Sequence, residues 1–201
     1  MNKEALIDSL RKQGINENII NAFFKVKRED FIPEKFIGYS YDDITLPLED
    51  GSTISQPSTI ALMLNLLEPK QGQKILEIGS GSGYALGLIS EIIKDGKVYG
   101  IELNKNLAIS SRKVLSDNSI VEILNKDGSE GLPKFAPFDR ILISASCSDM
   151  RIPSNIAEQL TENGIMVAAV KQSIVQFKKE NGKMHEKEYH GFLFVPLRTQ
   201  E

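Results

Sequence analysis

The sequence predicts an α/β protein built around a doubly wound, mostly parallel sheet that ends in an antiparallel hairpin, with helices on both faces and a helical extension at the N-terminus. Three observations support this fold class. From residue 74 onward, short apolar runs alternate with helical patterns, which is typical of βαβ units in a parallel sheet. The first of these runs stops at three glycines spaced two apart, where a strand would turn into a helix. Near the C-terminus, Asn181-Gly182 is a strong hairpin signal.

The first part of the chain is expected to contain helices separated by an irregular stretch. Residues 2–13 and 16–27 carry apolar side chains at helical spacing, which predicts two short helices. Proline and glycine interrupt residues 31–55, so this stretch is expected to be a long loop, and such loops in compact domains are usually functional. A third helix is expected over residues 56–67.

The remainder alternates between strand and helix, which makes the arrangement Rossmann-like. In such a sheet the ligand site lies at the carboxyl ends of the strands, where the strand order reverses. Residues 172–178 and 187–195 are expected to form the closing hairpin. Strands are expected near 74–78, 97–101, 120–125, 138–144 and 164–170, and helices near 84–94, 104–116 and 154–161.

The composition favours a single cytoplasmic domain and excludes several other classes of protein. A length of 201 residues suits one domain with a full hydrophobic core. The net charge of −3 carries no footprint of nucleic-acid binding, and no apolar run reaches the roughly 20 residues that cross a bilayer, so neither a nucleic-acid nor a membrane partner is expected. The N-terminus lacks the apolar core of a signal peptide, and the single cysteine, Cys147, suits a reducing compartment. His185 and His190 lack a matching ligand cluster, so no metal site is expected.

The glycine turn predicts a cofactor that carries a nucleoside. Backbone N–H groups of Gly79–Gly83 would face a ligand, and the next strand ends on Glu102, whose carboxylate can accept hydrogen bonds from two ribose hydroxyls. The spacing is G-x-G-x-G preceded by Glu77, without the third glycine that a pyrophosphate-binding helix needs. A smaller ligand with one nucleoside and no pyrophosphate fits this spacing better, and S-adenosylmethionine is such a ligand.

A second candidate contact follows the third strand of the alternating region. Asp127 could accept a hydrogen bond from an adenine amino group, and Gly128 would let the chain turn close to the ring. A plain Asp-Gly turn is the alternative for this pair, and a solvated strand-end carboxylate is the alternative for Glu102. The expected cofactor-binding residues are Glu77, Gly79, Ser80, Gly81, Ser82, Gly83, Glu102, Leu103, Asp127 and Gly128.

Several further segments give the chain a resemblance to a known family. The T-I-S-Q-P run at Thr53–Pro57 is the most specific of them, because many methyltransferases share the glycine turn. From about residue 22 to Leu197, the chain resembles protein-L-isoaspartate O-methyltransferases. The segments that carry the resemblance are Phe31–Pro33, Tyr41–Leu48, Gly51–Pro57, Glu77–Tyr84, Asp127–Gly131 and Ala136–Ile141.

The resemblance implies an enzyme of protein repair. Such an enzyme transfers a methyl group from S-adenosylmethionine to the free α-carboxylate of an L-isoaspartyl residue, and the ester then closes to a succinimide that reopens partly to aspartate. The implied partners are damaged proteins or peptides, and the implied state is a monomer. One methyltransferase domain would cover residues 1–201, with a helical extension and substrate-covering loop at 1–55, a cofactor-binding core at 56–171 and C-terminal antiparallel strands at 172–201.

By resemblance, Ser55 is the catalytic residue, and it would orient the acceptor carboxylate. Because a carboxylate is ionised at neutral pH and a sulfonium is already activated, alignment and exclusion of water can supply much of the rate. The alternative role for Ser55 is to cap the following helix, and loop packing is the alternative for Tyr41 and Asp43. The implied substrate-binding residues are Tyr41, Asp43, Thr53, Ile54, Gln56, Pro57, Ser144, Ala145 and Ser146.

The substrate half departs from the family pattern in two places. Residues 144–151 are polar where the family has a small, alanine-rich run, and Lys171 stands where the family has a glycine. These departures leave open a different acceptor, such as the carboxylate of a modified peptide, a small molecule or RNA. A catalytically silent binding protein with the same fold is a further alternative.

Overall fold

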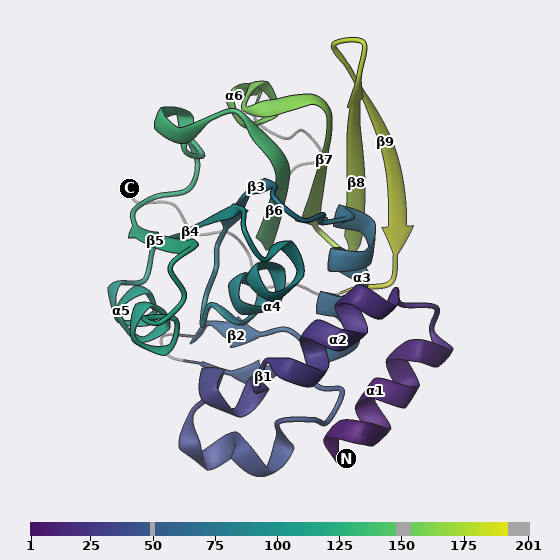
Figure 1. Cartoon of the computed structure of the whole chain (residues 1–201), viewed down its shortest axis with the longest axis vertical. Coiled ribbons are helices and arrows are strands. Elements are labelled where there is room, and N and C mark those ends of the chain that lie inside the picture. Colours follow the sequence, from purple (N-terminus) through teal and green to yellow (C-terminus); the bar gives the residue numbers. More distant parts are fainter. Residues whose placement is uncertain (49–50, 148–153, 193–201) are drawn as a thin grey trace.

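A seven-stranded sheet forms the centre of the computed structural model, which describes residues 1–48, 51–147 and 154–192 (Figure 1). Its strands are β3 (Lys74–Ile78), β4 (Lys97–Glu102), β5 (Val121–Asn125), β6 (Phe138–Cys147), β7 (Leu160–Val170), β8 (Ser173–Glu180) and β9 (Lys183–His190). They lie in the order β5-β4-β3-β6-β7-β8-β9. After β3 the chain adds β4 and then β5 on one side of the sheet, and after β6 it adds β7, β8 and β9 on the other side. The strand order therefore reverses between β3 and β6. This is the position where doubly wound sheets bind their ligands.

The pairing of the strands confirms the predicted sheet. β3 to β7 are parallel, whereas β8 and β9 run antiparallel to their neighbours. Asn181 and Gly182 form the turn between β8 and β9, with φ of 54° and 71°. A two-residue hairpin turn needs positive φ at both positions, which explains why asparagine and glycine stand there. β9 forms one edge of the sheet, and nearly all of its side chains are exposed.

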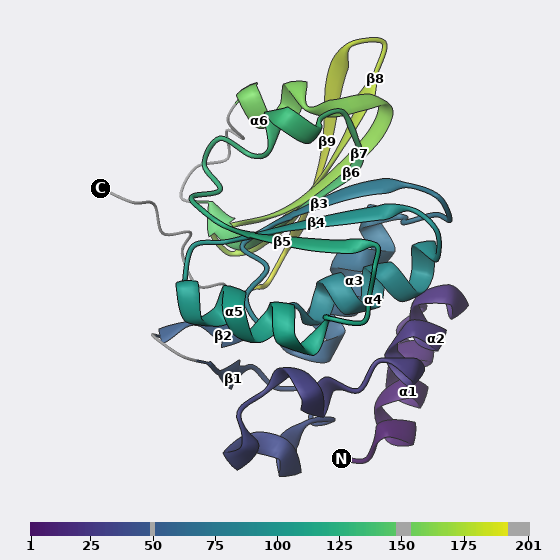
Figure 2. The ribbon, with the colours of Figure 1, turned by 60° about the vertical axis from the view of Figure 1, so that its left-hand side comes forward.

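Helices cover both faces of the sheet (Figure 2). α3, α4 and α5 lie against one face with α1 and α2 outside them, and the short α6 lies on the other face. In the described part of the chain, no helix combines the length and apolar character needed to cross a bilayer. The helices are α1 (Lys3–Lys12), α2 (Glu17–Lys25), α3 (Pro57–Leu67), α4 (Tyr84–Ile93), α5 (Lys105–Val114) and α6 (Ser154–Glu158).

The predicted loop over residues 31–55 contains short regular pieces. Two 3₁₀ helices, η1 (Arg28–Phe31) and η2 (Glu34–Tyr39), come first. A small antiparallel hairpin of β1 (Leu46–Pro47) and β2 (Thr53–Ile54) follows, outside the main sheet. A third 3₁₀ helix, η4 (Pro133–Phe135), precedes β6.

Three predicted boundaries differ clearly from the structure. The helix expected over 154–161 ends at Glu158, and the strand expected at 164–170 already begins at Leu160. Gln159 explains the early end, because its backbone carbonyl accepts a hydrogen bond from the N–H of Phe138 at 2.8 Å and so already pairs with β6. The register then shifts between Leu160 and Ile165, which indicates a bulge in β7. The last strand, expected at 187–195, is β9, which covers Lys183–His190 instead.

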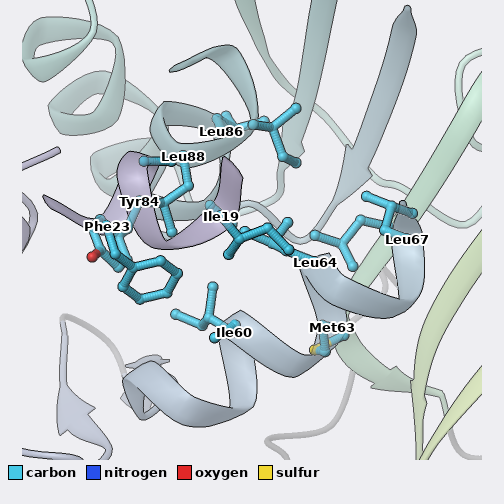
Figure 3. Packing of buried hydrophobic residues seen from close by; sticks show 14 of the residues in the cluster. Ile19, Phe23, Ile60, Met63, Leu64, Leu67, Tyr84, Leu86 and Leu88 are labelled. Atoms are coloured by element: carbon cyan, nitrogen blue, oxygen red, sulfur yellow. The ribbon is translucent and has the colours of Figure 1, made fainter. Parts of the chain in front are cut away.

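The N-terminal helix α2 packs against α4, the helix that follows the glycine turn. Tyr84 at the start of α4 is 2% exposed, and its ring meets that of Phe23 from α2 edge-on, with centroids 5.9 Å apart. The helical extension is therefore part of the main hydrophobic core. Figure 3 shows the side chains that meet there, Ile19 and Phe23 of α2, Ile60 and Leu64 of α3, and Tyr84 of α4.

Candidate active site

The glycine turn follows β3 and starts α4. Gly79, Gly81 and Gly83 have φ of 76°, 53° and 83°, in the left-handed region that favours glycine. A Cβ at Gly79 would also lie 2.9 Å from the Cβ of Ala145, so no larger residue fits there. The N–H groups of Gly79 and Ser80 donate to the carbonyl of Ile101 at 2.8 and 3.0 Å, which ties the turn to β4.

Glu102 at the end of β4 holds the same turn from the side. One carboxylate oxygen accepts a hydrogen bond from the N–H of Gly81 at 2.7 Å, and the other accepts from the N–H of Asn104 at 2.8 Å. Glu102 is 8% exposed. Since an ionised carboxylate has about four acceptor positions, Glu102 keeps capacity for ligand hydroxyls while it shapes the turn.

A pocket of about 520 Å³, partly open to solvent, lies between the glycine turn and the segment that joins β2 to α3. The pocket includes nine of the residues predicted for the site and five others. The predicted ones are Thr53, Ile54, Ser55, Glu77, Gly79, Ser80, Gly81, Ser82 and Ser144, and the others are Ile60, Met63, Tyr84, Ala85 and Leu142.

Glu77 supplies the carboxyl group among the residues that line the pocket. Its side chain is 1% exposed, and burial raises the pKa of its carboxyl to about 8. The hydroxyl of Ser144 donates to Oε1 at 2.6 Å and opposes that rise, whereas the charge of Glu102 adds to it. Oε2 of Glu77 and Oγ of Ser80 are buried and make no hydrogen bond within the described part of the chain.

Those two unpaired atoms test whether the pocket fits a nucleoside cofactor with a charged tail. A buried polar atom without a partner is costly, and a ligand that hydrogen-bonds to it removes the cost. A carboxylate oxygen accepts from an ammonium or a hydroxyl, and a serine hydroxyl can donate or accept. Glu77 and Ser80 therefore fit S-adenosylmethionine, which carries ammonium, sulfonium and ribose hydroxyl groups.

Ser55 lines the pocket from the opposite side. It is half-buried, and the residue that precedes the first turn of α3 is Gln56, which makes no side-chain capping bond. The N–H of Ser58 in that first turn instead donates to Oδ1 of Asp43 at 2.8 Å. Capping, the alternative role for Ser55, thus belongs to Asp43 in this structure. The backbone carbonyl of Ser55 accepts from Nη1 of Arg28 at 2.9 Å.

The other predicted residues do not line the pocket. Tyr41 donates its hydroxyl to the carboxylate of Glu29, so both Tyr41 and Asp43 order the loop that precedes Ser55. Oδ1 of Asp127 accepts from the N–H of Ser129 at 2.8 Å, and a Cβ at Gly128 would lie 2.6 Å from Ile78. Gly83, Leu103, Gln56, Pro57 and Ala145 are likewise not among the lining residues. The side chains of Ser146 and Cys147 and residues 148–151 lie outside the described residues.

Sequence reasoning missed the apolar half of the pocket and one cation behind it. Ile60 and Met63 belong to the apolar stripe of α3, which periodicity alone assigns to the core. Arg28 ends the run Lys25-Val26-Lys27-Arg28, which has the composition of a solvated basic segment. Neither carries a local signal for a ligand site. Among the described residues, no group of three or more His, Cys, Asp or Glu is placed to hold a metal ion.

Comparison with known proteins points to one family. A family model described as protein-L-isoaspartate(D-aspartate) O-methyltransferase matches residues 1–201. A curated protein-L-isoaspartate O-methyltransferase from Pyrobaculum arsenaticum is 38% identical over 203 residues, which cover 96% of this chain and 98% of that protein. A second one, from Thermosipho melanesiensis, is 37% identical and is covered completely.

Solved structures agree with this result. A protein-L-isoaspartate O-methyltransferase matches 97% of the chain with a TM-score of 0.89 and 27% identity, and the chain spans 65% of that protein's length. A Plasmodium falciparum protein assigned to the same activity, solved in complex with S-adenosyl-L-homocysteine, matches the whole chain with a TM-score of 0.85 and 26% identity.

Proposed function

The chain belongs to the protein-L-isoaspartate O-methyltransferase family, and it is an S-adenosylmethionine-dependent methyltransferase of isoaspartyl repair; from this premise we propose which of its residues bind the cofactor and which orient the acceptor. The single observation that supports this division is the pocket itself. One wall is the glycine turn with Glu77, and the other is the segment Thr53–Ser55. Two reactants held on opposite walls of one pocket can meet in line, which is the main requirement of a methyl transfer.

The cofactor wall binds by charge. The N–H groups of Gly79, Ser80, Gly81 and Gly83, which the sequence predicted to face a ligand, instead donate to acceptors within the protein. S-adenosylmethionine supplies, when bound, a methyl group on a positively charged sulfur. Glu77 holds the cationic end of the cofactor with its unpaired Oε2, and Glu102 accepts from the ribose hydroxyls while it keeps the turn in shape. Asp127 and Gly128 stay the predicted contacts of the adenine. They follow β5 directly, at the same edge of the sheet as the carboxyl ends of β3 and β4.

The acceptor wall works without a general base. A free α-carboxylate has an ordinary pKa of about 3.3–3.7, so it arrives ionised at neutral pH and needs no proton removed. The described lining residues of the pocket include no His, Lys or Arg. The hydroxyl of Ser55 donates to the acceptor carboxylate and orients one oxygen, while the apolar side chains of Ile60 and Met63 exclude water.

Two residues of the departures from the family pattern, Ser144 and Lys171, lie in the described part of the chain, and neither belongs to the acceptor wall at Thr53–Ser55. Ser144 directs its hydroxyl to Glu77 on the cofactor side. Lys171 is exposed in the tight turn between β7 and β8, with φ of 51°, and does not line the pocket. Both observations favour an isoaspartyl carboxylate over a different acceptor. We propose further that the protein acts in the cytoplasm, as its single cysteine suggests, and that it acts on damaged proteins as a monomer, as the family resemblance implies.

A paired-peptide assay tests the function. Two peptides that differ only in an isoaspartyl or aspartyl linkage are incubated with the enzyme and radiolabelled S-adenosylmethionine. We expect methylation of the isoaspartyl peptide alone, and Ser55→Ala is expected to lower turnover far more than cofactor affinity. Equal methylation of both peptides, or of neither, would remove isoaspartyl specificity. Titration calorimetry with S-adenosylmethionine tests the alternative of a catalytically silent protein. A protein that does not bind S-adenosylmethionine would exclude both enzyme hypotheses and leave that alternative.

A further inference from the structure

Arg28 is the most deeply buried cation of the described structure. Its side chain has no exposed surface and is the largest of the fully buried ones. Nη1 donates to the carbonyl of Ser55 at 2.9 Å, Nη2 donates to the carbonyl of Ile44 at 3.4 Å, and Nε has no partner within the described residues. The guanidinium carbon lies 5.5 Å from the ring centroid of Tyr84.

This placement is costly, so stability alone does not account for an arginine here. Burial lowers the pKa of the Arg28 guanidinium to about 10, with only partial opposition from Tyr84 and Asp43. Its hydrogen-bond partners are neutral carbonyls. A buried charge is costly unless it is paired and hydrogen-bonded, and these neutral partners offset only part of the cost.

The contacts of Arg28 join the two walls of the pocket. Ile44 precedes β1 and Ser55 follows β2, and these strands pair through Leu46 and Ile54. Arg28 therefore bridges the open end of this hairpin and fixes the backbone of Ser55. Tyr84, which packs under the guanidinium, is the first residue of α4 and follows the glycine turn directly.

We propose that Arg28 is the positioning residue of the methyl transfer: it holds Ser55 at a fixed place relative to the glycine turn. This inference rests on the proposed role of Ser55 as the group that orients the acceptor. In-line transfer is sensitive to small displacements, because a shift of about 1 Å can cost about 100-fold in rate. Arg28 also places a positive charge against the backbone of Ser55, with Nη1 2.9 Å from its carbonyl oxygen.

Arg28→Lys tests the proposal, since lysine keeps the charge but its compact ammonium lacks the fork that reaches two carbonyls. We expect kcat for an isoaspartyl peptide to fall about 10- to 100-fold. The dissociation constant of S-adenosyl-L-homocysteine and the KM of the peptide should stay near those of the wild type. Arg28→Met, which removes charge and donors but keeps much of the length, is expected to lower kcat at least as far and to raise the KM of the peptide.

Arg140→Lys is the matched control. Arg140 is also buried, at 5% exposure, and donates to the carbonyls of Glu68 and Asp139 at 3.2 and 2.8 Å, but it does not line the pocket or contact Ser55. We expect this variant to lose thermal stability and to keep kcat. If Arg28→Lys behaves in the same way, losing stability but not kcat, Arg28 is only structural and the proposal is wrong.

A double-mutant cycle with Ser55→Ala tests whether the effect of Arg28→Lys on kcat depends on Ser55. If Arg28 acts through Ser55, Arg28→Lys causes little further loss of kcat in the Ser55→Ala background, so the two losses are not additive. Fully additive losses would overturn the proposal. All variants are purified with S-adenosyl-L-homocysteine, because a ligand of the folded state counteracts unfolding, and the ligand is removed before the assays. A wild type without isoaspartyl activity would refute the proposed function itself, whereas an active wild type with unaffected Arg28 variants refutes only this inference.

Discussion

At the scale of single residues, the buried carboxyl of Glu77 shows how the fold prepares a binding site at the cost of its own stability. One oxygen is satisfied by Ser144, and the other lacks a partner among the described residues. Burial raises the pKa of Glu77, so the ligand-free protein holds the group largely neutral at pH 7. A cationic ligand favours the ionised form, and binding then releases a proton.

Glu77 is expected to make the stability of the ligand-free protein depend on pH. Between pH 4.5 and 8 the folded state keeps the proton that the unfolded state loses, so the free energy of unfolding falls as pH rises through this window. The full shift corresponds to roughly 5 kcal/mol. Urea denaturation at pH 5 and pH 8 measures this, and Glu77→Gln should remove most of the difference. The exposed Glu122→Gln serves as control and should leave it intact; a pH-independent wild type would contradict the prediction.

Ser144→Ala should weaken the cofactor site. The serine hydroxyl lowers the pKa of Glu77, so its loss makes the ionised carboxylate harder to form. We expect affinity for S-adenosylmethionine to fall by about 1–2 kcal/mol, as for the loss of a hydrogen bond to a charged group. Calorimetry checks this, with Ser110→Ala as the control, because the Ser110 hydroxyl donates to the carbonyl of Leu107 within α5 and does not line the pocket. Equal affinities of both variants would show that the Ser144 contact has no role in binding.

At the scale of elements, the glycine turn and the start of α3 are each held by a side chain from a distant segment. Glu102 binds the N–H of Gly81, and Asp43 binds the N–H of Ser58. In both cases a carboxylate satisfies a backbone donor at the N-terminal side of a helix, where negative charge is favourable. The two walls of the pocket therefore depend on acidic residues that do not line it.

Asp43→Ala is expected to loosen the acceptor wall. Loss of the cap should lower the free energy of unfolding by about 0.5–2 kcal/mol. Because Ser55 lies just before this helix, kcat should fall while the affinity for S-adenosyl-L-homocysteine stays close to that of the wild type. Chemical denaturation, kinetics and calorimetry together check this. Asp8→Ala, on an exposed surface of α1, is the matched control, and a variant of Asp43 that keeps full kcat would contradict the expectation.

Most elements of the sheet were predictable because their sequence patterns are local. β3 was predicted over its full range, since an apolar run ends there at glycine. The start of β7 was not, because Gln159 is drawn into the sheet by its bond to Phe138, a contact between distant residues. The pocket divides in the same way. The glycine turn has a sequence signature, whereas Arg28 and Met63 acquire their places only from tertiary packing.

At the scale of the whole molecule, the N-terminal extension and the sheet form one hydrophobic core. Phe23 of α2 and Phe31 of η1 pack against Tyr84, whose other neighbours include the guanidinium of Arg28. A ligand that fills the pocket contacts residues from both parts. Ligand binding is therefore expected to stabilise the extension together with the sheet.

S-adenosyl-L-homocysteine should raise the melting temperature in one cooperative transition. At 100 times its dissociation constant, a ligand adds about 2.7 kcal/mol to stability, which for a chain of this size corresponds to roughly 5–10 °C. Calorimetric scans with and without ligand measure the shift, and Glu77→Ala should show a smaller one at the same concentration. Two separate transitions, of which only one moves, would show that the extension unfolds independently of the sheet.

The exposed edge strand β9 has a consequence for an enzyme whose clients include misfolded chains. Such chains offer free backbone groups, and an open sheet edge is a template on which they could add as a further strand. β9 carries Lys183, Glu186, Lys187 and Glu188 along its length, with charges of both signs close together. A client strand would have to pair against this row of hydrated charges. Replacing Lys187 and Glu188 with valine is expected to increase light scattering when the protein is mixed with unfolded polypeptide, because fewer charges then oppose strand pairing at this edge. Unchanged scattering would contradict this expectation.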